Sequence, residues 1–271
     1  MAGRLRRFKR NIAFYAVLLA VVGFFGFFVF NLHGLFVHWQ DGRQAWENSE
    51  IVQEIFAPQL EAIVEAAVEP AVETETDPPP PDAEQTPMLD AARQLTGNDD
   101  IVAFISIPGT NIGNIVVQAA DNEYYLSRDA FGNDNVNGAL FMDFRNSRDF
   151  ADKSTVIYGH NMRNGSMFHN LRHFMNRDFF EAHPHILIIT DYNILIYEIF
   201  AAFSTNIDFY YIQVHFESPA EFADLINEII ARSNHNTDIS PTEADQILIL
   251  STCTNIREDT RFVIAGRLQN R

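Results

Sequence analysis

Cysteine is nearly absent from this chain, because its 271 residues include only Cys253. A single thiol excludes an intramolecular disulfide and a structural zinc site with several cysteine ligands. Basic residues are also scarce: 19 Lys and Arg stand against 36 Asp and Glu, and the formal net charge is -17. Such an acidic chain is a poor ligand for nucleic acid. The sequence also lacks an internal repeat and a glycine-rich phosphate loop.

Five basic residues gather at the N-terminus and precede 19 uncharged residues, Ile12 to Phe30. As a helix at about 1.5 Å per residue, this run spans roughly 28 Å, close to the thickness of a bilayer's hydrocarbon core. We predict a cytoplasmic basic tail over residues 1–11 and a transmembrane helix over residues 12–32. The positive-inside rule then places the rest of the chain outside the cell membrane. A cleaved signal peptide is the alternative, but the apolar run is longer than usual for one and no A-x-A-like site follows.

The segment after the apolar run has two parts. Residues 33–68 show helix-like apolar spacing and form a predicted juxtamembrane helical segment, with an interruption expected at Pro58. Residues 69–95 begin with a stretch rich in Pro, Glu and Thr that includes four consecutive prolines. That composition cannot bury a core and favours extended conformations, so it predicts a linker. One folded domain is predicted over residues 96–271.

Short strand-like runs separated by turn residues fill this domain. They are residues 101–107, 115–118, 139–142, 155–158, 186–190, 194–203, 247–250 and 262–268. Many short strands close together predict a mainly β fold, either a barrel or a sandwich. One helix is expected over residues 219–232, with Ser218 as N-cap and Glu221 as the capping-box acid. Its apolar stripe is expected to pack in the core: Phe222, Leu225, Ile226 and Ile229.

Cys253 follows an apolar run and precedes the polar segment 254–260, so we expect it at a strand end that reaches the surface. A lone cysteine is by default a small buried hydrophobic residue. An unpaired thiol outside the membrane nevertheless requires another explanation, and nucleophilic catalysis is one. A catalytic thiol needs a partner for proton transfer and a group that stabilises the oxyanion.

His160 and Arg261 are the candidates for those two roles. His160 follows the predicted strand 155–158 through one glycine, again at a strand end. Arg261 opens the strand after Cys253, and a hairpin between the two strands would bring their adjoining ends together. Arg267 lies about 20 Å further along at roughly 3.3 Å per residue, too far to serve the same oxyanion.

Several segments resemble, in family order, the motifs of class B sortases. The cysteine and arginine motifs are matched by residues 250–253 and 261–264, and the histidine region by 158–162 and 165–168. Further matches lie at 107–112, 121–126 and 141–146. The resemblance covers nearly all of residues 100–271. It implies a closed sortase-type β-barrel with N-terminal helices before it and an inserted helix between late strands.

The resemblance also implies a cysteine transpeptidase that acts on surface proteins with a C-terminal sorting signal. Cys253 would attack the peptide bond after a threonine, and Arg261 would hold the oxyanion. His160 would protonate the departing amine and later deprotonate the incoming one. The thioester would pass to an amine of a peptidoglycan precursor or stem peptide, or to a pilin lysine. No metal or other cofactor is implied.

Four further residues match regions that contact the sorting signal in relatives: Ser251, Thr252, Tyr211 and Ile212. For Tyr211 and Ile212, packing within a loop is an equally open interpretation.

Two departures from the family pattern stand beside the cysteine. Ile249 replaces a threonine that is frequent in the family, which we expect to change packing rather than chemistry. Thr254 and Asn255 are neutral where some class B members carry acids, which leaves open how His160 is oriented and which signal is preferred.

Other interpretations remain at this point. His169 and His173 have the i, i+4 spacing of zinc ligands on a helix but lack the glutamate of H-E-x-x-H. Asp143 and Arg145 suit a structural ion pair better than a catalytic one. At the level of function, the rivals are a membrane-tethered cysteine peptidase that passes the thioester to water, and a non-catalytic envelope protein that binds partners.

Overall fold

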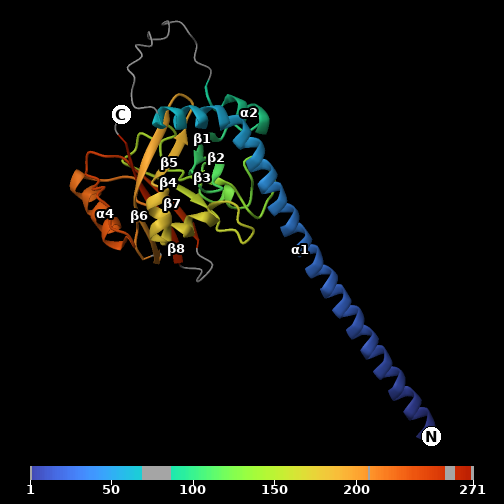
Figure 1. The fold of residues 1–271 in the computed structure, drawn as a ribbon. Coiled ribbons are helices and arrows are strands. Elements are labelled where there is room, and N and C mark those ends of the chain that lie inside the picture. Colours follow the sequence, from blue (N-terminus) through green and yellow to red (C-terminus); the bar gives the residue numbers. More distant parts are fainter. Residues whose placement is uncertain (1, 69–86, 207, 254–259, 270–271) are drawn as a thin grey trace. The chain divides into compact units, whose positions relative to one another are not determined.

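The structure, a computed structural model, describes residues 2–68, 87–206, 208–253 and 260–269 (Figure 1). Within these ranges the side chains of some residues, Cys253 among them, lie outside the description. The chain forms two compact units, residues 1–44 and 45–271. The first helix, α1 (Ala2–Val68), begins in the first unit and ends in the second.

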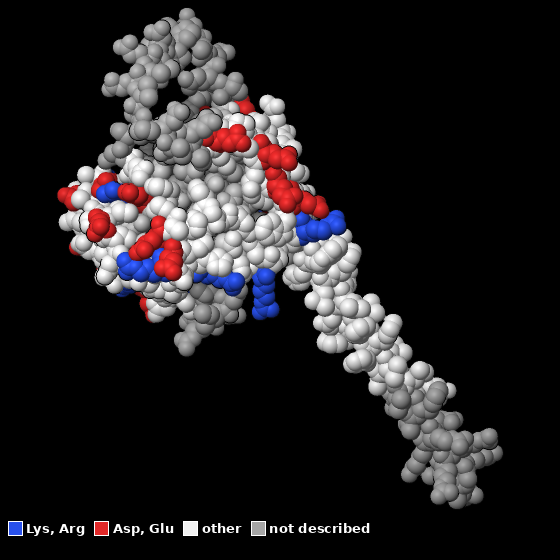
Figure 2. All heavy atoms as spheres, viewed as in Figure 1, with Lys and Arg blue, Asp and Glu red and all other residues white. Residues whose placement is uncertain are grey.

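The first unit consists of the part of α1 up to Gln44 and contains the apolar run. Among the described residues, one helical stretch, Leu18–Glu61, is long and apolar enough to cross a membrane by length and composition. None of its apolar window is buried, and Phe24, Phe27 and Phe30 are all more than 60% exposed. In Figure 2 the described residues of the apolar run are drawn white, as neither basic nor acidic. A helix with so much exposed apolar surface needs lipid or another apolar partner around it.

The second unit begins with the last part of α1, from Ala45 onward. The predicted interruption at Pro58 is wrong, because α1 continues through this residue. Proline removes one helical hydrogen bond, so it can bend a helix without ending it. The ribbon of α1 changes direction in its last part (Figure 1). Val52 and Phe56 are buried, and the Phe56 ring stacks on Phe104 with centroids 4.2 Å apart.

The core of the second unit is a closed β-barrel, which confirms the predicted fold. The strand order is β1-β2-β3-β4-β7-β8-β6-β5, and β5 pairs with β1 to close the barrel. Only β2–β3 and β4–β7 are parallel among the neighbouring pairs of described strands. Each strand overlaps a predicted one: β1 (Ile101–Ser106), β2 (Gly113–Val117), β3 (Leu140–Met142), β4 (Ser154–Gly159), β5 (His185–Ile189), β6 (Ile194–Asn206), β7 (Ile247–Cys253) and β8 (Thr260–Leu268).

The uninterrupted apolar run in β7 is explained by burial of both its faces. Leu248 and Leu250 point into the barrel interior, whereas Ile247 and Ile249 belong to a second apolar cluster beneath α4 (Pro219–Arg232). The predicted stripe of α4 lies in that second cluster: Phe222, Leu225, Ile226 and Ile229. This helix lies beside the barrel, between β6 and β7 in sequence (Figure 1).

The N-terminus of α4 is capped as predicted. The Ser218 hydroxyl accepts a hydrogen bond from the backbone N–H of Glu221 at 3.3 Å. The Glu221 carboxylate accepts in turn from the N–H of Glu217, one residue before the cap, at 2.6 Å. The two bonds satisfy backbone donors at the start of the helix and fix the chain that enters it.

Four short helical segments were not predicted: α2 (Asp90–Thr96), η1 (Tyr124–Leu126), η2 (Phe168–Met175) and α3 (Arg177–Ala182). All but the last residue of α2 falls in the predicted linker, yet Leu89 and Ala92 are fully buried and Arg93 forms a bidentate pair with Asp191 at 2.8 Å. The proline-rich part of that linker, residues 69–86, lies outside the described residues. The compact unit thus reaches further toward the N-terminus than residue 96, while the domain boundaries themselves stay predictions.

Candidate active site

Three strands bring polar residues to one end of the barrel. β4 and β7 are parallel, so their C-terminal ends lie at the same edge, with Gly159 opposite Thr252. β8 is antiparallel to β7, so its first residues reach that edge as well, with Arg261 opposite Cys253. His160 directly follows β4. The strand topology therefore gathers the three predicted catalytic positions at one end, whereas Arg267 pairs with Ile247 at the other.

An open pocket of about 300 Å³ lies at this end of the barrel. Six of the predicted site residues line it: His160, Arg261, Ser251, Thr252, Tyr211 and Ile212. Cys253 is described only through its backbone, as the last residue of β7 and the register partner of Arg261. The Cys253 side chain lies outside the description, so its role as the nucleophile stays a prediction.

His160 is half-buried and is held by a backbone carbonyl. Its Nε2 atom lies 2.8 Å from the carbonyl oxygen of Leu126. Because a carbonyl oxygen only accepts hydrogen bonds, Nε2 carries the proton in the neutral imidazole. This leaves Nδ1 as the atom that can exchange a proton with a thiol or an amine.

Gly138 permits that arrangement. Its φ of +61° is in the left-handed region, which favours glycine. A Cβ at this position would lie 2.6 Å from the Tyr125 carbonyl oxygen, 2.9 Å from that of Leu126 and 3.1 Å from Cδ2 of His160. A side chain here would therefore displace both the imidazole and the carbonyl that holds it.

Tyr211 packs within its loop and lines the pocket at the same time. It is only 5% exposed, and its hydroxyl forms a buried hydrogen bond with the Ser251 hydroxyl at 2.8 Å. This bond joins the loop after β6 to Ser251 of β7, two positions before the predicted nucleophile Cys253. The two interpretations left open from the sequence are thus compatible.

Arg261 stands at the start of β8. One of its Nη atoms donates to the carbonyl oxygen of Thr260 at 3.1 Å, and the side chain is half-buried. A guanidinium presents five donors in a fixed plane, a geometry that suits an oxyanion.

Asp143 and Arg145 form an ion pair behind the pocket. Burial alone would raise the pKa of Asp143, but hydrogen bonds from Arg145, Tyr158 and Asn122 outweigh it and leave the pKa below its ordinary value. Burial and the neighbouring Asp143 carboxylate raise the pKa of Tyr158. Near neutral pH, Asp143 is therefore charged and Tyr158 is neutral, which suits structure rather than proton transfer.

Comparison with known proteins identifies the family. A family model described as "Sortase domain" matches residues 105–269. The chain belongs to the sortase family. Sortase B of Listeria monocytogenes is 38% identical over 176 residues, which cover 63% of this chain and 70% of that relative. Sortase B of Staphylococcus aureus is 31% identical over 173 residues, with 63% and 71% covered.

Solved structures agree with this assignment. A Bacillus anthracis protein described as similar to sortase B has a TM-score of 0.63 and 36% identity, and the match covers 68% of this chain and 83% of that one. A structure described as a Staphylococcus aureus sortase B-substrate complex has a TM-score of 0.71 and 25% identity, covering 85% and 99%. This chain is thus a class B sortase, a family of cysteine transpeptidases that act on surface proteins.

The zinc interpretation of His169 and His173 finds no support in the described part of the chain. No group of three or more His, Cys, Asp or Glu side chains there could hold a metal ion. Nδ1 of His169 lies 3.0 Å from the side-chain oxygen of Asn161, and the ring of His173 packs against Phe179 with centroids 5.5 Å apart. Burial, followed by nearby Arg172, lowers the pKa of His169.

Sequence reasoning missed several residues of the sortase pocket: Asn122, Leu126, Phe141, Tyr158, Phe209 and Tyr210. Tyr158 could have been found, because residues two apart on a strand share a face and His160 lies two positions later. Leu126 could not, since its contact with His160 uses a backbone carbonyl that any residue would supply.

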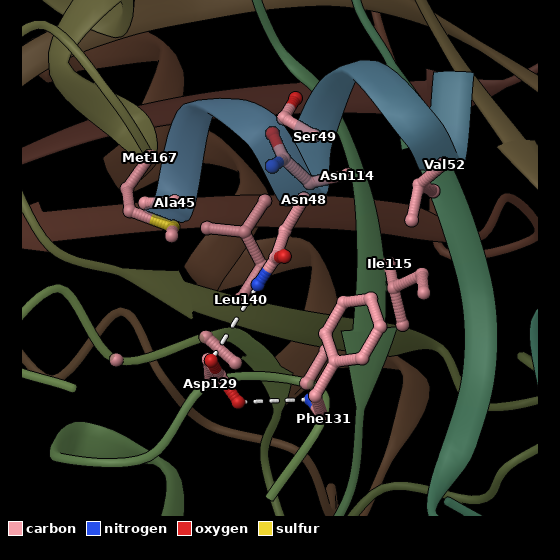
Figure 3. Close-up of a pocket in the computed structure, with 13 residues that line it drawn as sticks. Ala45, Asn48, Ser49, Val52, Asn114, Ile115, Asp129, Phe131, Leu140 and Met167 are labelled. Carbon is pink, nitrogen blue, oxygen red and sulfur yellow. Dashed lines mark hydrogen bonds between the residues drawn. The ribbon is translucent and has the colours of Figure 1, made fainter. Parts of the chain in front are cut away.

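A second, smaller cavity of about 40 Å³ lies between the last part of α1 and the barrel (Figure 3). Asp129 lies at its edge, where it accepts hydrogen bonds from the Asn48 amide at 3.5 Å and from the Phe131 N–H at 3.0 Å. The other labelled side chains in Figure 3 are mostly apolar. The Ser49 hydroxyl in its lining donates to the carbonyl oxygen of Gly113 at 3.1 Å rather than to a base, so this cavity is not a candidate reaction site.

Proposed function

We propose that this sortase is anchored in the cell membrane by α1 and cleaves a C-terminal sorting signal of surface proteins after threonine. It then transfers the new acyl group to an amine of the cell wall, or to a pilin lysine. The observation that carries this proposal is the shared pocket of His160 and Arg261 at the end of β7, with Arg261 opposite Cys253 in register.

The first half of the reaction exchanges a C–N bond for a C–S bond. The Cys253 sulfur, as thiolate, attacks the carbonyl carbon of the threonine, and the oxygen of that carbonyl gains the negative charge that Arg261 stabilises. The proton that the Cys253 thiol loses is taken up at Nδ1 of His160, and His160 then gives this proton to the departing amine while Nε2 remains engaged with the Leu126 carbonyl. The products are a thioester on Cys253 and a free amine.

The second half exchanges the C–S bond for a new C–N bond. An incoming amine attacks the thioester carbonyl, neutral His160 accepts its proton at Nδ1, and the Cys253 thiolate leaves. Water in place of the amine would make the chain a peptidase. The predicted pocket residues Ser251, Thr252, Tyr211 and Ile212 would hold the signal peptide, in keeping with the description of one structural neighbour as a substrate complex.

The reaction can be tested with the full chain in detergent micelles, a peptide library that contains threonine-bearing signals, and candidate amines. Mass spectrometry should detect a thioester on Cys253 and, when an amine is present, an amide product. Cys253→Ala should abolish both. Hydrolysis alone in the presence of amines would support the peptidase, and unchanged processing by Cys253→Ala would contradict thiol chemistry altogether.

The membrane placement has a separate test. We propose a cytoplasmic N-terminus and an extracellular barrel, which the five N-terminal basic residues and the exposed apolar surface of α1 support. Protease added to intact protoplasts should then remove the C-terminal unit. Full protection of that unit, together with digestion of a tag at the N-terminus, would reverse the proposed orientation.

A further inference from the structure

The Asp143–Arg145 pair has the geometry of a strong buried ion pair. Asp143 is fully buried and its two carboxylate oxygens accept from Nε of Arg145 at 2.8 Å and from Nη2 at 2.7 Å. The backbone N–H of Arg145 donates to the same carboxylate at 3.0 Å. Two parallel charge-assisted bonds fix the plane of the guanidinium as well as its distance. The pair is therefore a rigid element rather than a flexible surface contact.

The carboxylate side of this pair holds two pocket walls. Asp143 accepts from the Tyr158 hydroxyl at 2.8 Å and from the Asn122 amide at 3.0 Å. Tyr158 belongs to β4, two residues before His160, and Asn122 precedes η1. Both side chains line the pocket, although Asp143 does not.

The guanidinium side holds a third wall, the loop of residues 208–216 between β6 and α4. Arg145 donates to the Tyr210 hydroxyl at 2.6 Å and to the backbone carbonyl of Ile212 at 2.9 Å. Tyr210 and Ile212 line the pocket as well, and Tyr210 is 55% exposed. Loops of this kind have low local stability unless long-range contacts hold them. Arg145 supplies such a contact from a position about 65 residues earlier in the chain.

The position of the pair suits a structural role rather than proton transfer. Neither residue lines the pocket, and together they reach four residues that do. If Arg145 were removed, Asp143 would be left as an uncompensated buried charge and the Ile212 carbonyl would lose its donor. The wall formed by the loop would then move while His160 kept its own carbonyl partner.

We propose that Asp143 and Arg145 are positioning residues that set the shape of the peptide-binding wall through Tyr210 and Ile212. The pair governs how tightly the signal peptide is held and leaves the rate of the chemical step largely unchanged. This inference rests on the proposed transpeptidase function for its kinetic consequence, but the hold on the loop is a property of the chain alone.

The first test therefore needs no substrate. Hydrogen–deuterium exchange of the full chain in detergent is compared between the unaltered protein, Arg145→Met and the control Arg267→Met. Arg267 forms a similar half-buried pair with Glu198 at 2.7 Å, at the other end of β8. Arg145→Met should speed exchange in residues 208–216 by about tenfold or more, because the loop can then open locally without breaking its bonds to Arg145. Equal exchange in all three proteins would overturn the inference.

The second test is kinetic and uses the library peptide that the unaltered chain processes fastest. Arg145→Met should raise its KM about tenfold with kcat changed less than about threefold, because ground-state and transition-state binding fall together. Arg267→Met should change neither constant. A loss confined to kcat would contradict a positioning role, and an unaltered chain that processes no peptide would refute the proposed function while the exchange result still stands.

Tyr210→Phe tests the contact more gently and keeps the inference falsifiable if Arg145→Met does not fold. It deletes only the exposed hydroxyl that Arg145 holds, so exchange in residues 208–216 and KM should change in the same direction by a smaller factor. In an Arg145→Met background the same change should have no further effect. A full additional loss there would show that the hydroxyl acts on the peptide directly and would overturn its link to Arg145.

Discussion

Phe56→Ala should destabilise the barrel, although residue 56 belongs to the helix that starts in the predicted membrane anchor. The Phe56 ring is fully buried and stacks on Phe104 with centroids 4.2 Å apart and planes 14° apart. Truncation of a buried phenylalanine costs about 3–5 kcal/mol. At about 2–4 °C per kcal/mol for a unit of this size, the expected drop in Tm is roughly 6–20 °C.

The assay is thermal unfolding of the full chain in detergent, followed by near-ultraviolet circular dichroism. Ile51→Ala is a matched control, since Ile51 lies in the same helix and is 45% exposed. Alanine has the higher helix propensity at both positions, so local propensity works against the predicted loss. Equal Tm values for the two variants would refute the claim that the last part of α1 belongs to the folded unit.

Two further predictions concern charged residues. The folded-state pKa of Asp143 lies below its ordinary 3.8, so its contribution to stability is complete above about pH 4 and is lost as pH falls through the folded value. Urea unfolding at a series of pH values should show this loss of unfolding free energy at low pH in the unaltered chain and a smaller loss in Asp143→Asn. Equal losses in the two proteins would contradict the prediction. Arg261→Met should lower kcat by about 10²–10³-fold if it holds the oxyanion; initial rates would show this, and a change in KM alone would exclude that role.

The barrel strands were predictable because their signal is local. β7 reads as four consecutive apolar residues between polar segments, and each predicted strand has a counterpart in the barrel. The α4 helix was predictable for the same reason, since its N-cap and its apolar stripe lie within 15 consecutive residues. The prediction at Pro58 was wrong because it considered only the local sequence. The helix continues through this residue.

The site was partly predictable. His160 and Arg261 could be chosen because each stands at a strand end beside residues of the right chemistry, and their convergence in one pocket follows from the parallel β4–β7 pair and the β7–β8 hairpin. Their supporting contacts could not be chosen. The Leu126 carbonyl carries no side-chain signal, and the reach of Arg145 to Ile212 joins positions 67 residues apart.

The sequence by itself determined the apolar N-terminal run, the succession of short strands, the single thiol and the residues able to serve it, because each depends on composition or on spacing over a few neighbours. Only the tertiary structure decided which strands are neighbours, that α1 packs on the barrel through Phe56, and that the Asp143–Arg145 ion pair contacts three walls of a pocket. Contacts of this second kind depend on how distant segments meet, and a residue's identity does not specify its partner when the partner is a backbone carbonyl or lies on another strand.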